Sequence, residues 1–110
     1  MIPIIIPAYE PDQRLIGLLK ELSEYPYGPV ILVNDGSGSA YEDIFKAAKN
    51  LLSEKAILLT HEVNRGKGRA LKTAFQYIRE HLPKATGAVT ADSDGQHTKK
   101  SIMNVAEMML

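Results

Sequence analysis

Two carboxylates one residue apart, Asp92 and Asp94, follow a short apolar run and have the spacing of ligands for a divalent cation. Residues 88–90 predict a buried parallel strand, and Gly95 lets the chain turn after the second carboxylate. Side chains at the carboxyl ends of parallel strands face the crevice in which open α/β sheets bind ligands. We therefore interpret this stretch as a candidate Mg²⁺ or Mn²⁺ site that would face a phosphate. The alternative is a polar turn that caps the next helix.

A third carboxylate, Asp35, lies in a loop rich in glycine and serine that follows a strand-like run at residues 30–33. A carboxylate beyond a strand is suited to accept hydrogen bonds from a nucleobase or a ribose. The other interpretation is a turn plus a helix cap, for which asparagine, aspartate and serine are all favoured.

Residues 64–69, Asn-Arg-Gly-Lys-Gly-Arg, place three cations and two glycines at the predicted start of a helix. Exposed backbone and cations beside a helix start suit an anionic pyrophosphate. The spacing is not that of a Walker loop, and the run follows the third strand instead of the first. An exposed, solvated turn is the alternative, although cations at a helix start oppose the helix dipole and this cost favours a functional role.

The histidines and one tyrosine complete the candidates. His97 is three residues beyond Asp94, so it could join a metal or diphosphate site, or it could make a hydrogen bond at a helix start. For His61 and His81 we expect surface or packing roles. Tyr9 could stack on a base or cover the core.

The order of elements predicts an α/β fold with about four βα units around a parallel sheet, which is a Rossmann-like arrangement. Strand-like runs occur at residues 2–6, 30–33, 56–59 and 88–90. Between them are three helix-like runs with apolar stripes, expected to face the core: Leu15, Ile16, Leu18, Leu19 and Leu22 after a cap at Asp12; Ile44, Phe45, Ala48, Leu51 and Leu52; and Ala70, Leu71, Ala74, Phe75 and Ile78. All the candidate loops leave from carboxyl ends of strands, so we expect them at one edge. Together they would suit a nucleoside diphosphate with a divalent cation.

Length and composition limit the kinds of protein and partner that remain possible. The 110 residues suffice for one compact domain, residues 1–110, and the 13 basic and 13 acidic residues cancel, which argues against a nucleic-acid partner. The absence of cysteine fits a reducing compartment, and the cytoplasm is the default. No segment has the length and hydropathy of a membrane span. The predicted last helix, from residue 98 or 99, is apolar up to Leu110, which predicts a fragment of a larger domain.

Four motifs in this order resemble the inverting glycosyltransferases of family 2, which have the GT-A fold. They are Ile6-Pro7-Ala8-Tyr9, Val33-Asn34-Asp35-Gly36-Ser37, Asn64-Arg65-Gly66-Lys67-Gly68-Arg69-Ala70 and Ala91-Asp92-Ser93-Asp94-Gly95-Gln96-His97. The match extends over nearly the whole chain. The third and fourth motifs are most similar to those of the dolichyl- or polyprenyl-phosphate hexose transferases.

The resemblance implies roles for individual residues. Nucleotide-sugar binding would fall to Pro7, Ala8, Tyr9, Glu10, Asp35, Arg65, Lys67 and Asp92, and metal binding to Asp92 and Asp94. The family often has Asn-Glu after the Pro-Ala-Tyr element, whereas Glu10-Pro11-Asp12 follows here, so the acid that approaches the base is left open. The catalytic base and the acceptor site would lie beyond Leu110.

We therefore expect a metal-dependent, inverting transferase that moves a hexose from a UDP- or GDP-hexose to a lipid phosphate or a glycan. This chain would hold its donor-binding half and be inactive alone, and the whole protein would serve cell-envelope polysaccharide biosynthesis, in the cytoplasm or at the cytoplasmic membrane face. One alternative is a nucleotidyltransferase acting on sugar phosphates; its glycine-rich signature normally leaves the first strand, where this chain has Pro7-Ala8-Tyr9-Glu10. The other is a nucleotide-binding interaction module without turnover.

Overall fold

The computed structural model describes residues 2–24 and 28–91 of the chain. Within these ranges strands and helices alternate, and two short 3-10 helices, η1 and η2, flank α2. The elements are β1 (Ile4–Ala8), α1 (Gln13–Leu22), β2 (Val30–Asp35), η1 (Ser39–Tyr41), α2 (Glu42–Leu52), η2 (Ser53–Lys55), β3 (Ala56–His61), α3 (Lys67–His81) and β4 (Val89–Thr90).

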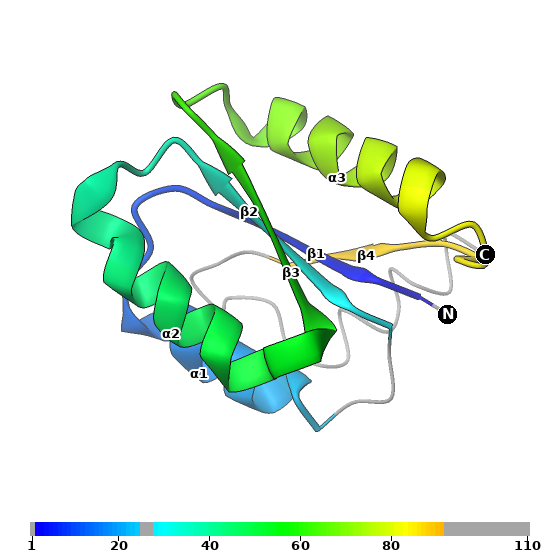
Figure 1. Cartoon of the computed structure of the whole chain (residues 1–110), viewed down its shortest axis with the longest axis horizontal. Helices are drawn as coiled ribbons and strands as arrows, with labels where there is room; N and C mark the ends of the chain where they lie inside the picture. Colours follow the sequence, from blue (N-terminus) through cyan, green and yellow to red (C-terminus); the bar gives the residue numbers. More distant parts are fainter. Residues whose placement is uncertain (1, 25–27, 92–110) are drawn as a thin grey trace.

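The four strands form a parallel sheet in the order β3-β2-β1-β4. The chain first moves outward from β1 through β2 to β3, and then returns to the other side of β1. Helices α1 and α2 cover one face, and α3 crosses the other face on the way to β4 (Figure 1). The order of strands thus reverses between β1 and β4, and in open parallel sheets ligands bind beside such a reversal, at the carboxyl ends of the strands.

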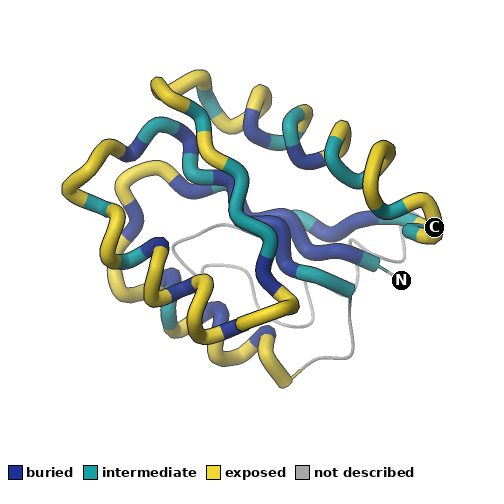
Figure 2. Tube along the Cα trace, viewed as in Figure 1, coloured by how far each residue is buried: buried dark blue, intermediate teal, exposed yellow. Residues whose placement is uncertain are grey.

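Successive side chains of a strand point to opposite faces of the sheet, and both faces pack against helices. The central strands β1 and β2 are buried along most of their length (Figure 2). Ile4 and Ile6 pack toward α1 and α2, whereas Ile5 packs with Ile31 and Val33 toward α3. On α3 the buried residues are alanines, Ala70 and Ala74. Because each strand is covered on both faces, its residues form continuous apolar runs, which is the pattern that the sequence displayed.

The predicted α/β architecture is confirmed, and so is the cap of α1, where Asp12 Oδ1 accepts the Arg14 N–H at 2.9 Å. Strands β2 and β3 are each two residues longer than predicted, because parallel pairing continues through Asp35 and His61. Strand β1 is as long as predicted but is shifted by two residues, from 2–6 to Ile4–Ala8. Pro7, which we expected in a loop, lies within β1.

Proline is tolerated in β1 because neighbouring residues bond to opposite sides of the strand. The carbonyl groups of Pro3 and Ile5 accept hydrogen bonds from β4, at Val89 and Ala91, while the Ile4 N–H donates to the β2 side. By this alternation the nitrogen of Pro7 faces the β4 side. Its missing N–H therefore costs nothing in the pairing of β1 with β2.

Two predicted core positions were wrong. Leu51 is 39% exposed and Phe75 is 38% exposed. Each lies at the margin of its apolar stripe, and Leu52 on α2 and Ala74 on α3 take the inward direction instead.

We predict that Gly36→Ala destabilises the chain more than Gly38→Ala does. Both glycines have positive φ, at +72° and +85°, which residues with a side chain rarely adopt, so each substitution carries a backbone cost of about 1–3 kcal/mol. A Cβ on Gly36 would also lie 2.2 Å from the backbone of Val63 and Asn64, whereas nothing lies within 4 Å of one on Gly38. Overpacking should add about 1–3 kcal/mol at Gly36 alone. Urea unfolding of the two variants measures the difference, and equal losses would contradict the close approach of the two loops.

Candidate functional site

Three loops follow the carboxyl ends of β1, β2 and β3, and buried polar side chains join them. Within the described ranges, the buried polar or charged residues are Asp35, 3% exposed, and Ser37, 6% exposed. Both come from the end of β2 and the loop that follows it. Buried polar groups need hydrogen-bond partners, and these two residues find theirs in the neighbouring loops.

The carboxylate of Asp35 accepts hydrogen bonds from the loop between β3 and α3. The N–H of Arg65 donates to Oδ1 at 2.9 Å, and the N–H of Gly66 donates to Oδ2 at 2.9 Å. Asn64 Nδ2 lies 3.3 Å from Oδ2 and 3.3 Å from the Asp35 carbonyl oxygen. The N-cap of α3, Gly66, has no side-chain cap of its own, so the carboxylate places a negative charge at the positive end of the helix dipole.

A histidine occupies the other side of Asp35. His61 Nδ1 is 2.8 Å from Asp35 Oδ1, and its Nε2 is 2.8 Å from Thr73 Oγ1. The His61 side chain is 10% exposed. Asp35 and His61 are register partners on β2 and β3, and Thr73 is on α3, so this chain of contacts crosses three elements.

The pKa of Asp35 reflects two opposed effects. Burial raises the pKa of the carboxyl, but the hydrogen bond from His61 and those from the N–H groups of Arg65 and Gly66 outweigh burial and hold the pKa below its ordinary value of 3.8. Asp35 is therefore an anion at neutral pH, and it acts as a hydrogen-bond acceptor only.

Ser37 joins the second loop to the first. The N–H of Glu10 donates to Ser37 Oγ at 2.9 Å, and the N–H of Ser37 donates to Asn34 Oδ1 at 3.0 Å. Glu10 has a φ of 48°, which is uncommon for a residue other than glycine. The bond to Ser37 holds this conformation, so the loop after β1 is fixed to the loop after β2.

The structure brings most of the predicted nucleotide-sugar residues to one edge. Pro7 and Ala8 form the end of β1, and Tyr9, 51% exposed, directly follows. Arg65 and Lys67 are exposed, on the loop whose backbone Asp35 holds. The predicted residues Asp92, Asp94 and His97 lie outside the described ranges.

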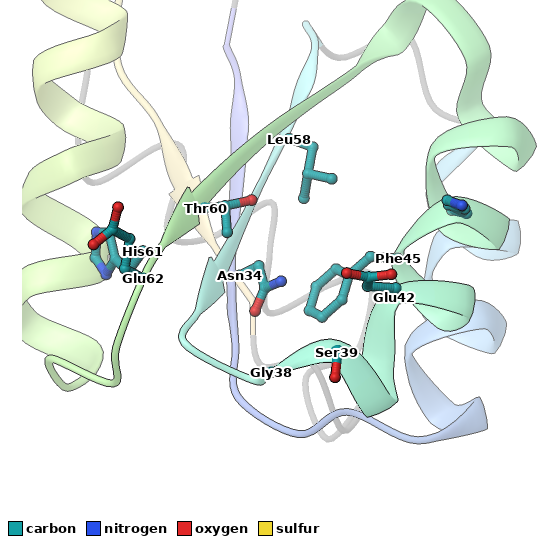
Figure 3. A pocket seen from close by; sticks show the side chains of 10 residues that line it. Asn34, Gly38, Ser39, Glu42, Phe45, Leu58, Thr60, His61 and Glu62 are labelled. Carbon is teal, nitrogen blue, oxygen red and sulfur yellow. The ribbon is translucent and has the colours of Figure 1, made fainter.

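A hollow of about 380 Å³ lies on the α2 side of β3 and shares Asn34 and His61 with the joined loops. Phe45 and Leu58 form its apolar part, and Asn34 and Glu42 are among its polar residues (Figure 3). His61 is drawn on the α3 side of the same strand. None of the predicted nucleotide-sugar residues that the structure describes lines this hollow.

The described residues contain no metal-binding group of three His, Cys, Asp or Glu side chains. The last of them, Ala91, precedes Asp92 in the sequence and donates its N–H to Ile5 of β1 at 3.0 Å. The described chain thus ends beside the middle of β1, and because β4 is parallel to β1, it runs toward the carboxyl edge of the sheet directly before the predicted metal motif.

Sequence reasoning did not predict that Ser37, His61 and Thr73 join the loops. Ser37 was one of the residues favoured in a turn or helix cap, which was one of two interpretations of its loop, and for His61 we expected a surface or packing role. The partners Asp35 and His61 are 26 residues apart. The signal that could have paired them is the register of β2 against β3, which no local pattern reveals.

A parallel sheet with helices on both faces and a reversal of strand order defines a Rossmann-like α/β protein. The model for "Glycosyl transferase family 2" matches residues 4–110. The chain belongs to this family, and its architecture agrees with the Rossmann-like GT-A fold.

Two relatives from methanogens extend the comparison. A UDP-N-acetylglucosamine–dolichyl-phosphate N-acetylglucosaminyltransferase of Methanococcus voltae is 31% identical, over all of this chain and 47% of the relative. A protein of Methanocaldococcus jannaschii described as uncharacterized is 31% identical, over 97% of this chain and 41% of the relative. The chain thus spans less than half the length of these curated relatives. Among the helices that the structure describes, none is long and apolar enough to cross a membrane.

We predict that the stability contributed by Asp35 disappears in acid. Because its pKa is lower in the folded state, the contribution is complete above the unfolded value of about 3.8 and is lost as the pH falls through the folded value. Asp35→Asn should therefore cost about 3 kcal/mol at pH 7, where it removes a charged acceptor from two N–H groups. The gap to the wild type should narrow below pH 3.8. Urea unfolding at pH 7 and at about pH 3 tests this expectation, with Asp43→Asn, exposed on α2, as the control. A gap that stays constant with pH would refute it.

Proposed function

We propose that the intact protein is a glycosyltransferase that transfers a sugar from a nucleoside-diphosphate sugar to a lipid-phosphate acceptor. Membership of family 2 supports the reaction class. The observation that supports a donor site at the carboxyl edge is that Asp35 and Ser37 join three loops there. The acceptor class is inferred from the name of the Methanococcus voltae relative, which acts on dolichyl phosphate.

For the base and ribose we propose the edge formed by Pro7, Ala8, Tyr9 and Glu10, with the loop after β2. Tyr9 is exposed and offers an aromatic face for stacking. A carboxylate has about four acceptor positions, and four donors already approach the Asp35 carboxylate. Asp35 would then serve the nucleotide mainly by shaping the loops, and a direct contact would displace Asn64, whose bond is the longest of the four.

For the diphosphate we propose Arg65 and Lys67, together with Asp92 and Asp94 as ligands of Mg²⁺ or Mn²⁺. Support comes from the direction of β4, which runs parallel to β1 and leads the chain past Ala91 toward the reversal of strand order. When bound there, a divalent cation would compensate negative charge on the departing nucleoside diphosphate. The exposed cations of this chain would bind the same charge from the side of the β3–α3 loop.

The finer points of the proposal are a hexose or N-acetylhexosamine as the sugar, inversion at the anomeric carbon, and a reaction at the cytoplasmic face of a membrane, where a lipid phosphate would be reached. In this proposal the catalytic base and the residues that bind the acceptor belong to the part of the protein outside this chain. This division agrees with the 41% and 47% of the relatives' lengths that the chain covers. The whole protein would serve the synthesis of cell-envelope polysaccharides.

We predict metal-dependent binding of one nucleoside diphosphate to the intact protein. Calorimetric titration with UDP and with GDP, each with and without Mn²⁺, should show binding of one of them that Mn²⁺ strengthens. Asp94→Ala should abolish the metal-dependent part and leave the fold unchanged, because a loop carboxylate contributes to the ligand more than to the core. Asp43→Ala, an exposed acid on α2, is the matched control. Metal-dependent affinity that Asp94→Ala leaves unchanged would remove this residue from the site.

The transfer itself is tested with labelled sugar donors and a polyprenyl phosphate in detergent. We expect labelled glycolipid and free nucleoside diphosphate as products. Release of pyrophosphate from a nucleoside triphosphate and a sugar phosphate would instead support a nucleotidyltransferase. Binding of the donor without any turnover would support an interaction module.

A further inference from the structure

The loop of residues 62–66, here the β3–α3 loop, combines an anchored backbone with exposed side chains. The N–H groups of Arg65 and Gly66 are held by a buried carboxylate, while the side chains of Arg65 and, just beyond the loop, Lys67 are exposed. The backbone of Val63 and Asn64 also passes so close to Gly36 that a Cβ there would be 2.2 Å away. Because Asp35 binds the backbone of this loop, any group that orients the Asp35 carboxylate also orients the loop.

His61 holds Asp35 from the strand side. It is the last residue of β3, directly before the loop, and it bonds Asp35 on β2 through Nδ1 at 2.8 Å. Through Nε2 it meets Thr73 on α3, also at 2.8 Å. Both ends of the loop, β3 and α3, are thus joined by one imidazole ring, and the same ring orients the carboxylate that binds the middle of the loop.

The hydrogen-bond donors and acceptors of Asp35, His61 and Thr73 are compatible with this arrangement in either protonation state of the imidazole ring. Ionised Asp35 only accepts, so Nδ1 carries a proton. Thr73 Oγ1 also lies 3.0 Å from the Arg69 carbonyl oxygen. With neutral His61 the hydroxyl donates to Nε2, and with protonated His61 it accepts from Nε2 and donates to Arg69. The bridge from Asp35 to α3 is complete in both cases.

We infer that His61 is a positioning residue of the donor site, which, supported by Thr73, orients Asp35 and thereby fixes the β3–α3 loop that presents Arg65 and Lys67. The fixing of the loop rests on the contacts above. That the presented cations bind the diphosphate of the donor rests on the proposed function. Two experiments separate these two parts.

The first experiment needs no ligand. Amide hydrogen exchange of Arg65 and Gly66 in the intact protein reports the two N–H groups that Asp35 holds. His61→Ala should accelerate both by about tenfold, the effect expected for losing a hydrogen bond to a charged group. His61→Asn, whose amide nitrogen takes the place of Nδ1, should restore slow exchange. His81→Ala, at the exposed far end of α3, is the matched histidine control. Unchanged exchange in His61→Ala would overturn the inference.

The second experiment measures donor binding. His61→Ala should raise the KM for the donor about tenfold while kcat at saturating donor and the KM for the acceptor stay near the wild-type values. Thr73→Val, which removes the hydroxyl at nearly constant size, should raise the donor KM less, and Thr73→Ser should match the wild type. A role in stability alone would lower the unfolding temperature without this selective rise in donor KM.

A double-mutant cycle with Arg65→Ala tests the route of the effect. If His61 acts by placing the loop that carries Arg65, the loss in the double variant should be clearly smaller than the sum of the two single losses, with the remainder assigned to Lys67. Fully additive losses would overturn this route. If the wild type binds neither UDP nor GDP, the proposed function fails, and the exchange experiment still decides whether His61 fixes the loop.

Discussion

A buried carboxylate is the constraint on which the functional edge depends. Taking Asp35 out of water is costly unless donors replace its hydration, and here the donors come from His61, from the side chain of Asn64 and from the backbone of Arg65 and Gly66. Each of these groups lies on β3 or on the loop that follows it, so satisfying one charge on β2 also fixes the path of the next loop. These hydrogen bonds also bring the loop close to Gly36. The two backbones can pass each other there because glycine has no side chain.

The edge is built as a rigid backbone that carries exposed side chains. Ser37 fixes the loop after β1, and Asp35 fixes the loop after β3. Asp35 is the last residue of the core strand β2 and Ser37 follows it closely, so the end of β2 holds both neighbouring loops. Tyr9 and Arg65 extend from these loops into solvent. Such an arrangement reduces the ordering cost of binding, since the ligand has to immobilise side chains but not the chain itself. The negative charge of Asp35 also favours the start of α3, where Lys67 and Arg69 by themselves would oppose the helix dipole.

The two faces of the sheet are packed differently. Helices α1 and α2 bury the larger side chains of the core, whereas α3 approaches the other face through Ala70 and Ala74. Small residues bring α3 near the sheet, and this proximity lets Thr73 reach the imidazole of His61 on β3. Membership of glycosyl transferase family 2 agrees with this architecture, in which the order of strands reverses between β1 and β4, and this reversal is where we propose that the donor binds.

Patterns in the amino-acid sequence were enough to predict the alternation of strands and helices, the cap at Asp12, the apolar stripes apart from Leu51 and Phe75, and the family, through its four motifs. These are local features, set by periodicity, turn chemistry and the order of short segments. The contact of Asp35 with His61, 26 residues away, and the contact of His61 with Thr73 could not be predicted in this way. That pairing depends on the register of β2 against β3 and on the placement of α3, which result from packing of the whole sheet. No neighbouring residue in the sequence encodes them, and so the residues that join the loops became visible only in three dimensions.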